Sequence, residues 1–198
     1  MQNDQTIDEV IDEIFALYER YGDADYIGEP VSQLEHMSQS AQLAISEGFD
    51  DEVILAAFFH DIGHICVQKN EEDKMGDFGV KRHEQIGSDF LRARGFSEKV
   101  AKLVENHVQA KRYLTFANPE YYQSLSEASK KTLVHQGGKM TAAEAEAFQK
   151  DPLFEASIRM RQWDELAKEM MVPIMDLNEI KGRVIKVLSK SPRNLTLL

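Results

Sequence analysis

The sequence predicts an all-α protein that folds as a single helical domain, and three observations support this. Apolar residues recur at positions i, i+3, i+4 and i+7, the spacing of one buried helical face. No alternating pattern of useful length, which would be typical of a strand, accompanies them. The 198 residues include 42% hydrophobic ones, enough for one compact core, and no linker or repeat divides them. We expect one domain over residues 1–198, with its core at about 5–188 and a flexible C-terminal tail around Pro192.

Local start and stop signals bound each expected helix. Capping boxes occur at Thr6 with Glu9 and at Thr141 with Glu144. The pair Asp151-Pro152 places a proline at the first position of a later helix. Polar segments that contain glycine or proline separate the helices and predict loops, notably at 23–30 and 66–81. The expected helices cover about 7–21, 31–47, 51–60, 83–94, 97–112, a segment after Thr141, 151–170 and 177–188, with short helices inside 115–140.

Composition excludes several classes of partner and compartment. The net charge of -11, without a stretch dense in lysine and arginine, argues against nucleic acid as the main partner. Cys66 is the single cysteine, so an intramolecular disulfide is impossible and a reducing cytoplasm is expected. No signal peptide is evident, and no apolar stretch reaches the ~20 residues that span a bilayer. A cytoplasmic protein without membrane association, and without nucleic acid as its main partner, is therefore expected.

Histidines on apolar helical segments carry the chemical signal. The pair His60-Asp61 stands at the end of an apolar helix, beside Phe58 and Phe59. Imidazole and carboxylate groups both ligate divalent and trivalent metals. Burying the Asp61 carboxylate among aromatic rings would be costly without a cation to pair with it. The pair therefore indicates a metal site.

Each of these residues also has a simpler interpretation. Taken alone, His36 fits a hydrogen-bonded core residue, and Asp164 fits a salt-bridge partner on a solvated helix. The pair His60-Asp61 alone fits a helix end, and Lys111 and Arg161 fit surface ion pairs at helical spacing. The whole ordered set favours the metal site, because independent core histidines would not be expected to reproduce it. That set is His36, His60-Asp61, His83, His107 and Asp164.

The ordered set resembles the metal-ligand pattern H…HD…D of the HD-domain superfamily. His83 and His107 are similar to the additional ligands of its mixed-valent di-iron oxygenases. The resemblance is strongest to the branch of phosphonate-cleaving oxygenases of the PhnZ/TmpB type, and it covers residues 5–170. It rests on the stretches Asp25-Tyr26-Ile27-Gly28-Glu29, Gln33-Leu34-Glu35-His36, His60-Asp61-Ile62-Gly63-His64, Ala110-Lys111-Arg112-Tyr113-Leu114 and Gln136-Gly137-Gly138.

The resemblance implies an HD-domain helical bundle that holds two iron ions as an Fe(II)/Fe(III) pair and uses O2 as co-substrate. One iron would be held by His36, His60, Asp61 and Asp164. Asp61 would bridge to the second iron, which His83 and His107 would also hold. Catalytic metals keep open positions for substrate, so this second ion is the expected reaction site.

The same resemblance assigns the residues around the second iron. Tyr26 would occupy an open position of that ion when no substrate is bound, and Glu29 would face the cationic end of the substrate. His64, Lys111 and Arg161 lie near metal ligands at helical spacing and suit an oxyanion. The resemblance adds Ser129, Thr132 and Gln136 as further substrate contacts. His135 has no counterpart and is expected at the surface, and Cys66 is expected to be a small buried residue.

The implied activity is oxidative cleavage of the C–P bond of a 1-hydroxy-2-aminoethylphosphonate whose nitrogen is free or methylated. Differences from the PhnZ pattern at residues 30–32 and 65–78 favour the trimethylammonio substrate, with glycine betaine and phosphate as products. The free amine would give glycine instead. A metal-dependent phosphohydrolase of the HD type and a catalytically silent metal-binding regulator are the alternatives from other classes. A manganese or cobalt hydrolase would fit the same ligands.

Overall fold

The computed structural model describes residues 5–26, 28–67, 75 and 79–190. In these ranges the regular structure is helical, and an isolated bridge pairs Asp25 with Ser32. The prediction of an all-α protein is confirmed. The expected tail around Pro192 and most of the loop at 66–81 lie outside the described residues. The elements are α1 (Ile7–Tyr21), α2 (Gln33–Ser46), α3 (Asp51–Phe59), the 3-10 turn η1 (Ile62–His64), α4 (His83–Ala93), α5 (Glu98–Ala117), α6 (Pro119–Ser124), α7 (Glu127–His135), α8 (Ala142–Gln149), α9 (Phe154–Leu166) and α10 (Leu177–Leu188).

Side-chain caps set the helix starts, and two of them confirm the sequence signals. The capping boxes of Thr6 and Thr141 are both formed. A third box, which the sequence analysis missed, joins Ser32 to Glu35. It starts α2 two residues later than expected, because the Ser32 hydroxyl accepts the backbone N–H of Glu35.

Two further helix boundaries differ from the prediction. Helix α5 continues past Arg112 to Ala117, where Asn118 and Pro119 end it and begin α6. Helix α9 begins at Phe154 rather than at Asp151, because the Asp151 carboxylate accepts the N–H of Leu153 in a preceding turn.

The end of α9 is also earlier than the expected Met170. The backbone of Ala167 leaves the helical conformation, with φ -78° and ψ 45°. This turn directs the Ala167 carbonyl toward His36, where it accepts a hydrogen bond. The early end of α9 therefore serves the histidine cluster.

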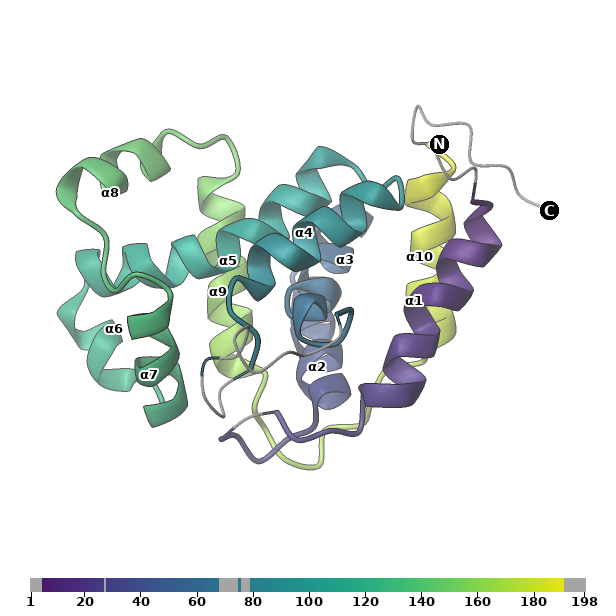
Figure 1. The fold of residues 1–198 in the computed structure, drawn as a ribbon, viewed down its shortest axis with the longest axis horizontal. Helices are drawn as coiled ribbons and strands as arrows, with labels where there is room; N and C mark the ends of the chain where they lie inside the picture. The colour runs from purple at the N-terminus through teal and green to yellow at the C-terminus, as the bar shows by residue number, and fades with distance from the viewer. Residues whose placement is uncertain (1–4, 27, 68–74, 76–78, 191–198) are drawn as a thin grey trace.

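The main core lies where α3 is surrounded by α2, α5, α9 and α10 (Figure 1). Helix α3 is apolar on every side, and its residues Val53–Phe59 are all buried. Trp163 and Met37 pack against it from α9 and α2. Helices α1 and α10 lie side by side at one edge and close the core with their apolar faces (Figure 1).

A second, smaller apolar cluster supports the far end of the long helix α5. It joins α5 to α8 through Ala110, Ala145 and Phe148, with Tyr113 and Phe154 packed against them. The short helices α6, α7 and α8 gather around this end of α5 (Figure 1). Helix α7 forms one wall of the cavity described below.

Candidate metal centre and substrate cavity

Six buried histidine and aspartate side chains, from four helices and from the two residues that follow α3, converge at the centre of the molecule. Their positions on the backbone differ, because only some lie within a helix. His60 follows the last residue of α3, Asp61 follows it before η1, and His83 is the first residue of α4. The remaining members lie inside α2, α5 and α9 and are His36, His107 and Asp164.

The six side chains form two groups, each able to hold one metal ion. Within each group, one ligand atom of every residue lies within 4.8 Å of the others. The first group is His36, His60 and Asp164, and the second is Asp61, His83 and His107. The geometry therefore offers two adjacent metal positions, and it brings together all six predicted ligands.

The Asp61 carboxylate stands between the two groups. Its Oδ2 atom lies 3.4 Å from Nε2 of His60 and 3.8 Å from Nε2 of His36. Its Oδ1 atom lies 3.3 Å from Nε2 of His83 and 3.4 Å from Nε2 of His107. One oxygen thus faces each group, which is the arrangement of a bridging carboxylate.

The outer nitrogens of all four imidazoles contact backbone carbonyls. Nδ1 of His36 is 2.9 Å from the Ala167 carbonyl, and Nδ1 of His107 is 2.6 Å from that of Val104. The corresponding distances for His60 and His83 are 2.8 and 3.3 Å. Because a carbonyl only accepts, each Nδ1 must donate its proton, which fixes the tautomer.

This tautomer leaves the inner nitrogens as lone pairs directed at one another. Nε2 of His36 lies 3.0 Å from Nε2 of His60, and the same distance separates His83 from His107. Converging lone pairs beside two carboxylates repel unless cations lie between them. The donor set of imidazole and carboxylate suits iron, manganese or cobalt. The residues therefore fit a centre of two metal ions.

Electrostatics keep both carboxylates ionised, as metal ligation requires. Burial by itself would raise the pKa of Asp61. Without a metal ion, Asp61 raises the pKa of His60 to about 9, and the positive charge of this protonated His60 holds the pKa of Asp61 well below its ordinary value. Burial likewise opposes ionisation of Asp164, and the Arg161 guanidinium outweighs it, so the pKa of Asp164 is also low.

A cavity opens beside the second metal group, with about 530 Å³ of empty space including its mouth. Much of this space is open solvent at the mouth, so the enclosed part is small and suits a small molecule rather than a polymer. All the predicted substrate residues line it, namely Glu29, His64, Lys111, Ser129, Thr132, Gln136 and Arg161, together with Tyr26. The sequence analysis missed three lining residues, Gln33, Met75 and Ala128.

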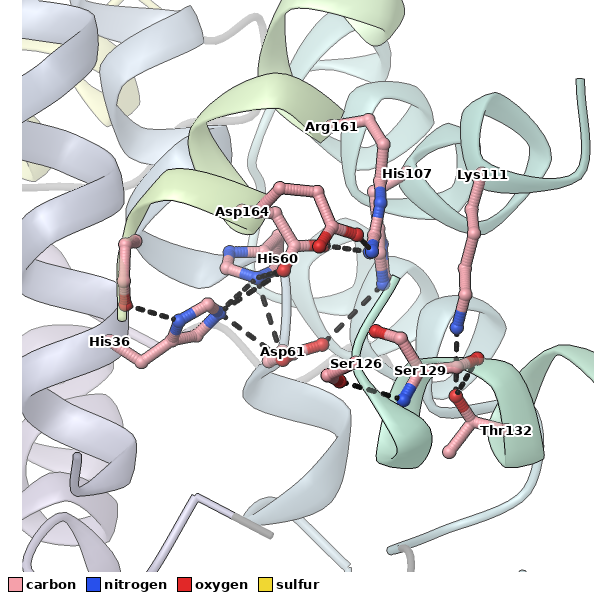
Figure 2. A network of polar contacts seen from close by, with 12 residues as sticks. His36, His60, Asp61, His107, Lys111, Ser126, Ser129, Thr132, Arg161 and Asp164 are labelled. Atoms are coloured by element: carbon pink, nitrogen blue, oxygen red, sulfur yellow. Dashed lines mark hydrogen bonds and ion pairs between the residues drawn. The ribbon is translucent and has the colours of Figure 1, made fainter. Parts of the chain in front are cut away.

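Lys111 and α7 form the wall opposite the metals (Figure 2). The Lys111 ammonium is buried and donates to the Thr132 hydroxyl at 2.7 Å. That hydroxyl donates in turn to the Ser129 carbonyl at 3.1 Å. Burial and the neighbouring Arg161 charge hold the pKa of Lys111 well below its ordinary value. Without an anion in the cavity the charged form of Lys111 is destabilised, and an anionic group bound beside it would stabilise that form.

His64 reaches the cavity by a route other than the expected one. The prediction assumed that helix α3 continues, but it ends at Phe59, and the turn η1 carries His64 inward. The imidazole stacks on His83 at 4.0 Å between ring centroids. Its Nδ1 accepts the Val80 N–H at 3.0 Å, so the other nitrogen carries the proton and can donate to a ligand.

Arg161 lines the cavity but already has protein partners. One of its nitrogens donates to the Asp164 carboxylate, and another lies against Glu165 (Figure 2 shows Arg161 beside Asp164). Its Nε donates to the Tyr121 hydroxyl at 2.8 Å. Arg161 therefore orients a candidate metal ligand, a role that its i, i+3 spacing to Asp164 allowed but that the sequence analysis had not predicted.

Tyr26 and Glu29 enter the cavity from the loop between α1 and α2. The Tyr26 ring stacks on His36, with centroids 3.8 Å apart and planes 13° apart. Burial and the nearby Asp61 carboxylate raise the pKa of Tyr26 well above its ordinary value. Glu29 accepts a hydrogen bond from the Lys168 ammonium at 3.0 Å, a partner that the sequence analysis missed.

Two residues were predicted to lie outside the site. His135 is exposed at the end of α7, as expected. Cys66 is half-buried, and burial raises the pKa of its thiol to about 11, so it is largely protonated at neutral pH.

The metal groups and their order along the chain agree with a known family. The sequence model of the HD domain matches residues 33–167, which include all six candidate ligands. The chain belongs to the HD-domain family. Residues 33–167 span α2 to α9, so the family match contains the central helix α3 and the cavity wall formed by α7, whereas α1 and α10 lie outside it.

Three relatives align with most of this HD-domain chain. An uncharacterized protein of Acanthamoeba polyphaga mimivirus is 42% identical over 98% of the chain and 88% of its own length. The [1-hydroxy-2-(trimethylamino)ethyl]phosphonate dioxygenase (glycine-betaine-forming) of Leisingera caerulea is 39% identical over 80% of each chain. The hydroxymethylphosphonate dioxygenase of Gimesia maris is 35% identical over 94% of the chain and 92% of its own length. The resemblance to HD-domain oxygenases of the PhnZ/TmpB type is thereby confirmed.

Proposed function

We propose that this protein is a di-iron oxygenase that uses O2 to cleave the C–P bond of a small hydroxyphosphonate. One structural observation carries the proposal. The Asp61 carboxylate joins two metal groups, and the second of them borders a cavity whose opposite wall holds a buried lysine. The names of the two dioxygenase relatives support the same reaction.

The substrate that we propose is 1-hydroxy-2-(trimethylammonio)ethylphosphonate. It would react with one O2 to give glycine betaine and phosphate. The C–P bond and the C–H bond of the same carbon break, the carbon and the phosphorus each gain one oxygen atom from O2, and the hydrogen leaves as a proton. The two broken bonds supply the four electrons that reduce O2. Two irons, as an Fe(II)/Fe(III) pair, would supply the redox chemistry when bound.

Protein side chains would orient the substrate between the metals and α7. The Lys111 ammonium and the hydroxyls of Ser129 and Thr132 would neutralise and bind the phosphonate, with His64 and Gln136 as further polar partners. Buried Oε1 of Gln136 has no hydrogen-bond partner among the described residues, and its amide can turn an N–H toward the anion. The cavity is thus most cationic where the phosphonate oxygens would lie.

The other end of the substrate would lie toward Tyr26 and Glu29. A trimethylammonium group binds to aromatic faces and to carboxylates at some distance, and these two residues offer both. A free amine would make a direct hydrogen bond to Glu29, which is why 1-hydroxy-2-aminoethylphosphonate remains the second candidate.

The proposal also includes the extent of the domain, its compartment and the kind of partner it binds. We expect residues at about 5–188 to act as one domain, in the cytoplasm. The net charge of -11 supports a small-molecule partner rather than nucleic acid. Among the described residues, no helix has both the length and the apolar character needed to cross a membrane.

The test is phosphate release from the hydroxyphosphonate by protein loaded with iron. We expect release that requires O2, one O2 consumed per phosphate, and a half-integer-spin signal from the coupled iron pair in electron paramagnetic resonance. A phosphate monoester should not be hydrolysed. Release of phosphate from that ester without O2, with manganese or cobalt, would instead establish the phosphohydrolase alternative.

A further inference from the structure

A chain of alternating charges runs from the metal centre to the far end of the cavity. Arg161, which holds Asp164, lies against Glu165 on the same helix. Glu165 is 3.4 Å from the Lys168 ammonium, and Lys168 is 3.0 Å from Glu29. The chain ends on the carboxylate that faces the tail of the proposed substrate.

Lys168 occupies an unusual place in this chain. Glu29 lines the cavity, whereas Lys168, two residues past the end of α9, is not among the lining residues. The side chains of Lys168 and Glu29 are only 14% and 11% exposed. A carboxylate this enclosed is strongly disfavoured without a cationic partner. Lys168 supplies that partner from within the protein.

Lys168 also has a second carboxylate within reach. Glu165 lies one helical turn before it and almost as close as Glu29. The ammonium can therefore pair with Glu165 when another cation takes its place on Glu29. This exchange needs only a side-chain rotation and leaves none of these charges unpaired.

We propose that Lys168 is a positioning residue that acts through Glu29 and lets the cavity accept hydroxyphosphonates with and without a cationic tail. This inference rests on the proposed function of the site. With an uncharged tail, Lys168 neutralises Glu29, so no buried carboxylate is left unpaired. With a cationic tail, Lys168 moves to Glu165 and Glu29 pairs with the substrate.

The consequence is weak discrimination between the two kinds of substrate. A site with an unpaired Glu29 would bind an uncharged tail poorly. Binding would remove water from the Glu29 carboxylate, and the tail would offer no hydrogen bond or charge in its place. Lys168 removes that penalty. It also competes with a cationic tail for Glu29, which lowers affinity for the charged substrate.

The experiment compares two substrates whose tails differ in charge, 1-hydroxy-2-(trimethylammonio)ethylphosphonate and hydroxymethylphosphonate. The measurement is the ratio of their kcat/KM values, together with the ratio of their Kd values from calorimetry without O2. In Lys168→Gln we expect both ratios to shift about 10- to 100-fold toward the cationic substrate, from the loss of one charge-assisted bond. Lys168→Arg should keep the wild-type ratios.

Two further variants distinguish an effect of the charges on Glu29 and Lys168 from a general disturbance of the fold. Glu29→Gln should shift the ratios toward hydroxymethylphosphonate. The double variant with Lys168→Gln should bind that substrate about as well as wild type, because neither partner is then left unpaired. Lys150→Gln, which breaks an exposed pair with Glu146, is the matched control and should change neither ratio.

Equal losses on both substrates in Lys168→Gln would assign Lys168 a merely structural role and overturn the inference. The proposed function fails separately, if wild type releases no phosphate from either compound under O2. The Kd ratios still decide the role of Lys168 in that case. If neither phosphonate bound wild type at millimolar concentration, both proposals would be wrong.

Discussion

The Tyr26 ring lies flat on the imidazole of His36, with the two planes only 13° apart. His36 belongs to the first metal group, so an aromatic side chain from the loop covers one ligand of the centre. The loop itself is tied at its base, where Tyr26 N–H donates to the Val31 carbonyl and Gln33 N–H to that of Ala24. Movement at this end of the cavity is therefore expected in the side chain more than in the backbone.

The first prediction concerns the hydroxyl of Tyr26. We expect Tyr26 to ligate the second iron in the resting protein and to leave when substrate binds. Phenolate bound to ferric iron gives a visible charge-transfer band, which substrate should bleach. Tyr26→Phe keeps the stacked ring, so it should retain two irons, lack the band and react faster with O2 in the absence of substrate. An unchanged spectrum and unchanged stability in air would show that Tyr26 does not protect the centre.

The second prediction concerns the bridge. Asp61→Ala should lose both metals, because each carboxylate oxygen faces a different group. His83→Ala and His107→Ala should each weaken the second metal more than the first. Metal content per chain, measured by mass spectrometry after dialysis, provides the readout. His135→Ala, at an exposed histidine, is the control and should retain the wild-type content. Two metals bound to Asp61→Ala would remove Asp61 from the bridging role.

The convergence of the six candidate ligands could be predicted because residue type and order carry the information. A carboxylate such as Asp61, placed in an apolar segment, is costly to bury without a cation beside it, and this holds for any fold that buries the segment. Helical spacing also placed Lys111 and Arg161 on the same faces as His107 and Asp164, and the structure agrees.

The pairing of charges could not be predicted, because it depends on how distant segments pack. Lys168 and Glu29 are 139 residues apart in sequence and meet only because the end of α9 lies against the loop after α1. The early end of α9 at Leu166 follows from the Ala167 carbonyl bonding to His36, a contact across 131 residues. Local propensity contains neither contact, so the sequence predicted a longer helix and did not predict the pairing of Glu29 with Lys168.

The third prediction uses the buried ammonium of Lys111. Lys111→Met removes the charge and keeps the length, so phosphonate binding should weaken by about 10- to 100-fold. Without phosphonate, however, the variant should be more stable than wild type at neutral pH, because burial and Arg161 lower the pKa of Lys111. Each unit of lowering costs about 1.4 kcal/mol of folding free energy.

The pH dependence of that stability difference has a definite sign. The unfolded chain keeps the Lys111 proton up to a pH of about 10.4, whereas the folded protein releases it at lower pH. Unfolding therefore takes up a proton between these values, and wild type gains stability as pH rises. The advantage of Lys111→Met, measured by denaturant unfolding, should shrink as the pH approaches 10. Lys139→Met, at an exposed lysine, should show no such trend. A constant or growing advantage would contradict the lowered pKa.

The last prediction concerns Gly63, which lies between His60-Asp61 and His64. A Cβ at this position would overlap the backbone carbonyl of His83, the first residue of α4. The absence of a side chain therefore lets η1 pack directly on the start of α4. Since the clash is with backbone, it cannot be relieved by a rotamer change, and α4 would have to move.

Gly63→Ala should consequently displace His83, lose metal from the second group and retain it in the first. The free energy of unfolding should fall by about 1–3 kcal/mol, the usual cost of overpacking. Gly182→Ala is the matched control, because its Cβ meets nothing within 4 Å and the position lies inside α10. There the substitution should raise stability by about 0.5–1 kcal/mol through helix propensity and leave both metals bound. If Gly63→Ala kept both metals with wild-type affinity, the position of His83 would not depend on this contact, and α4 would have to be held in place by its packing on α5 alone.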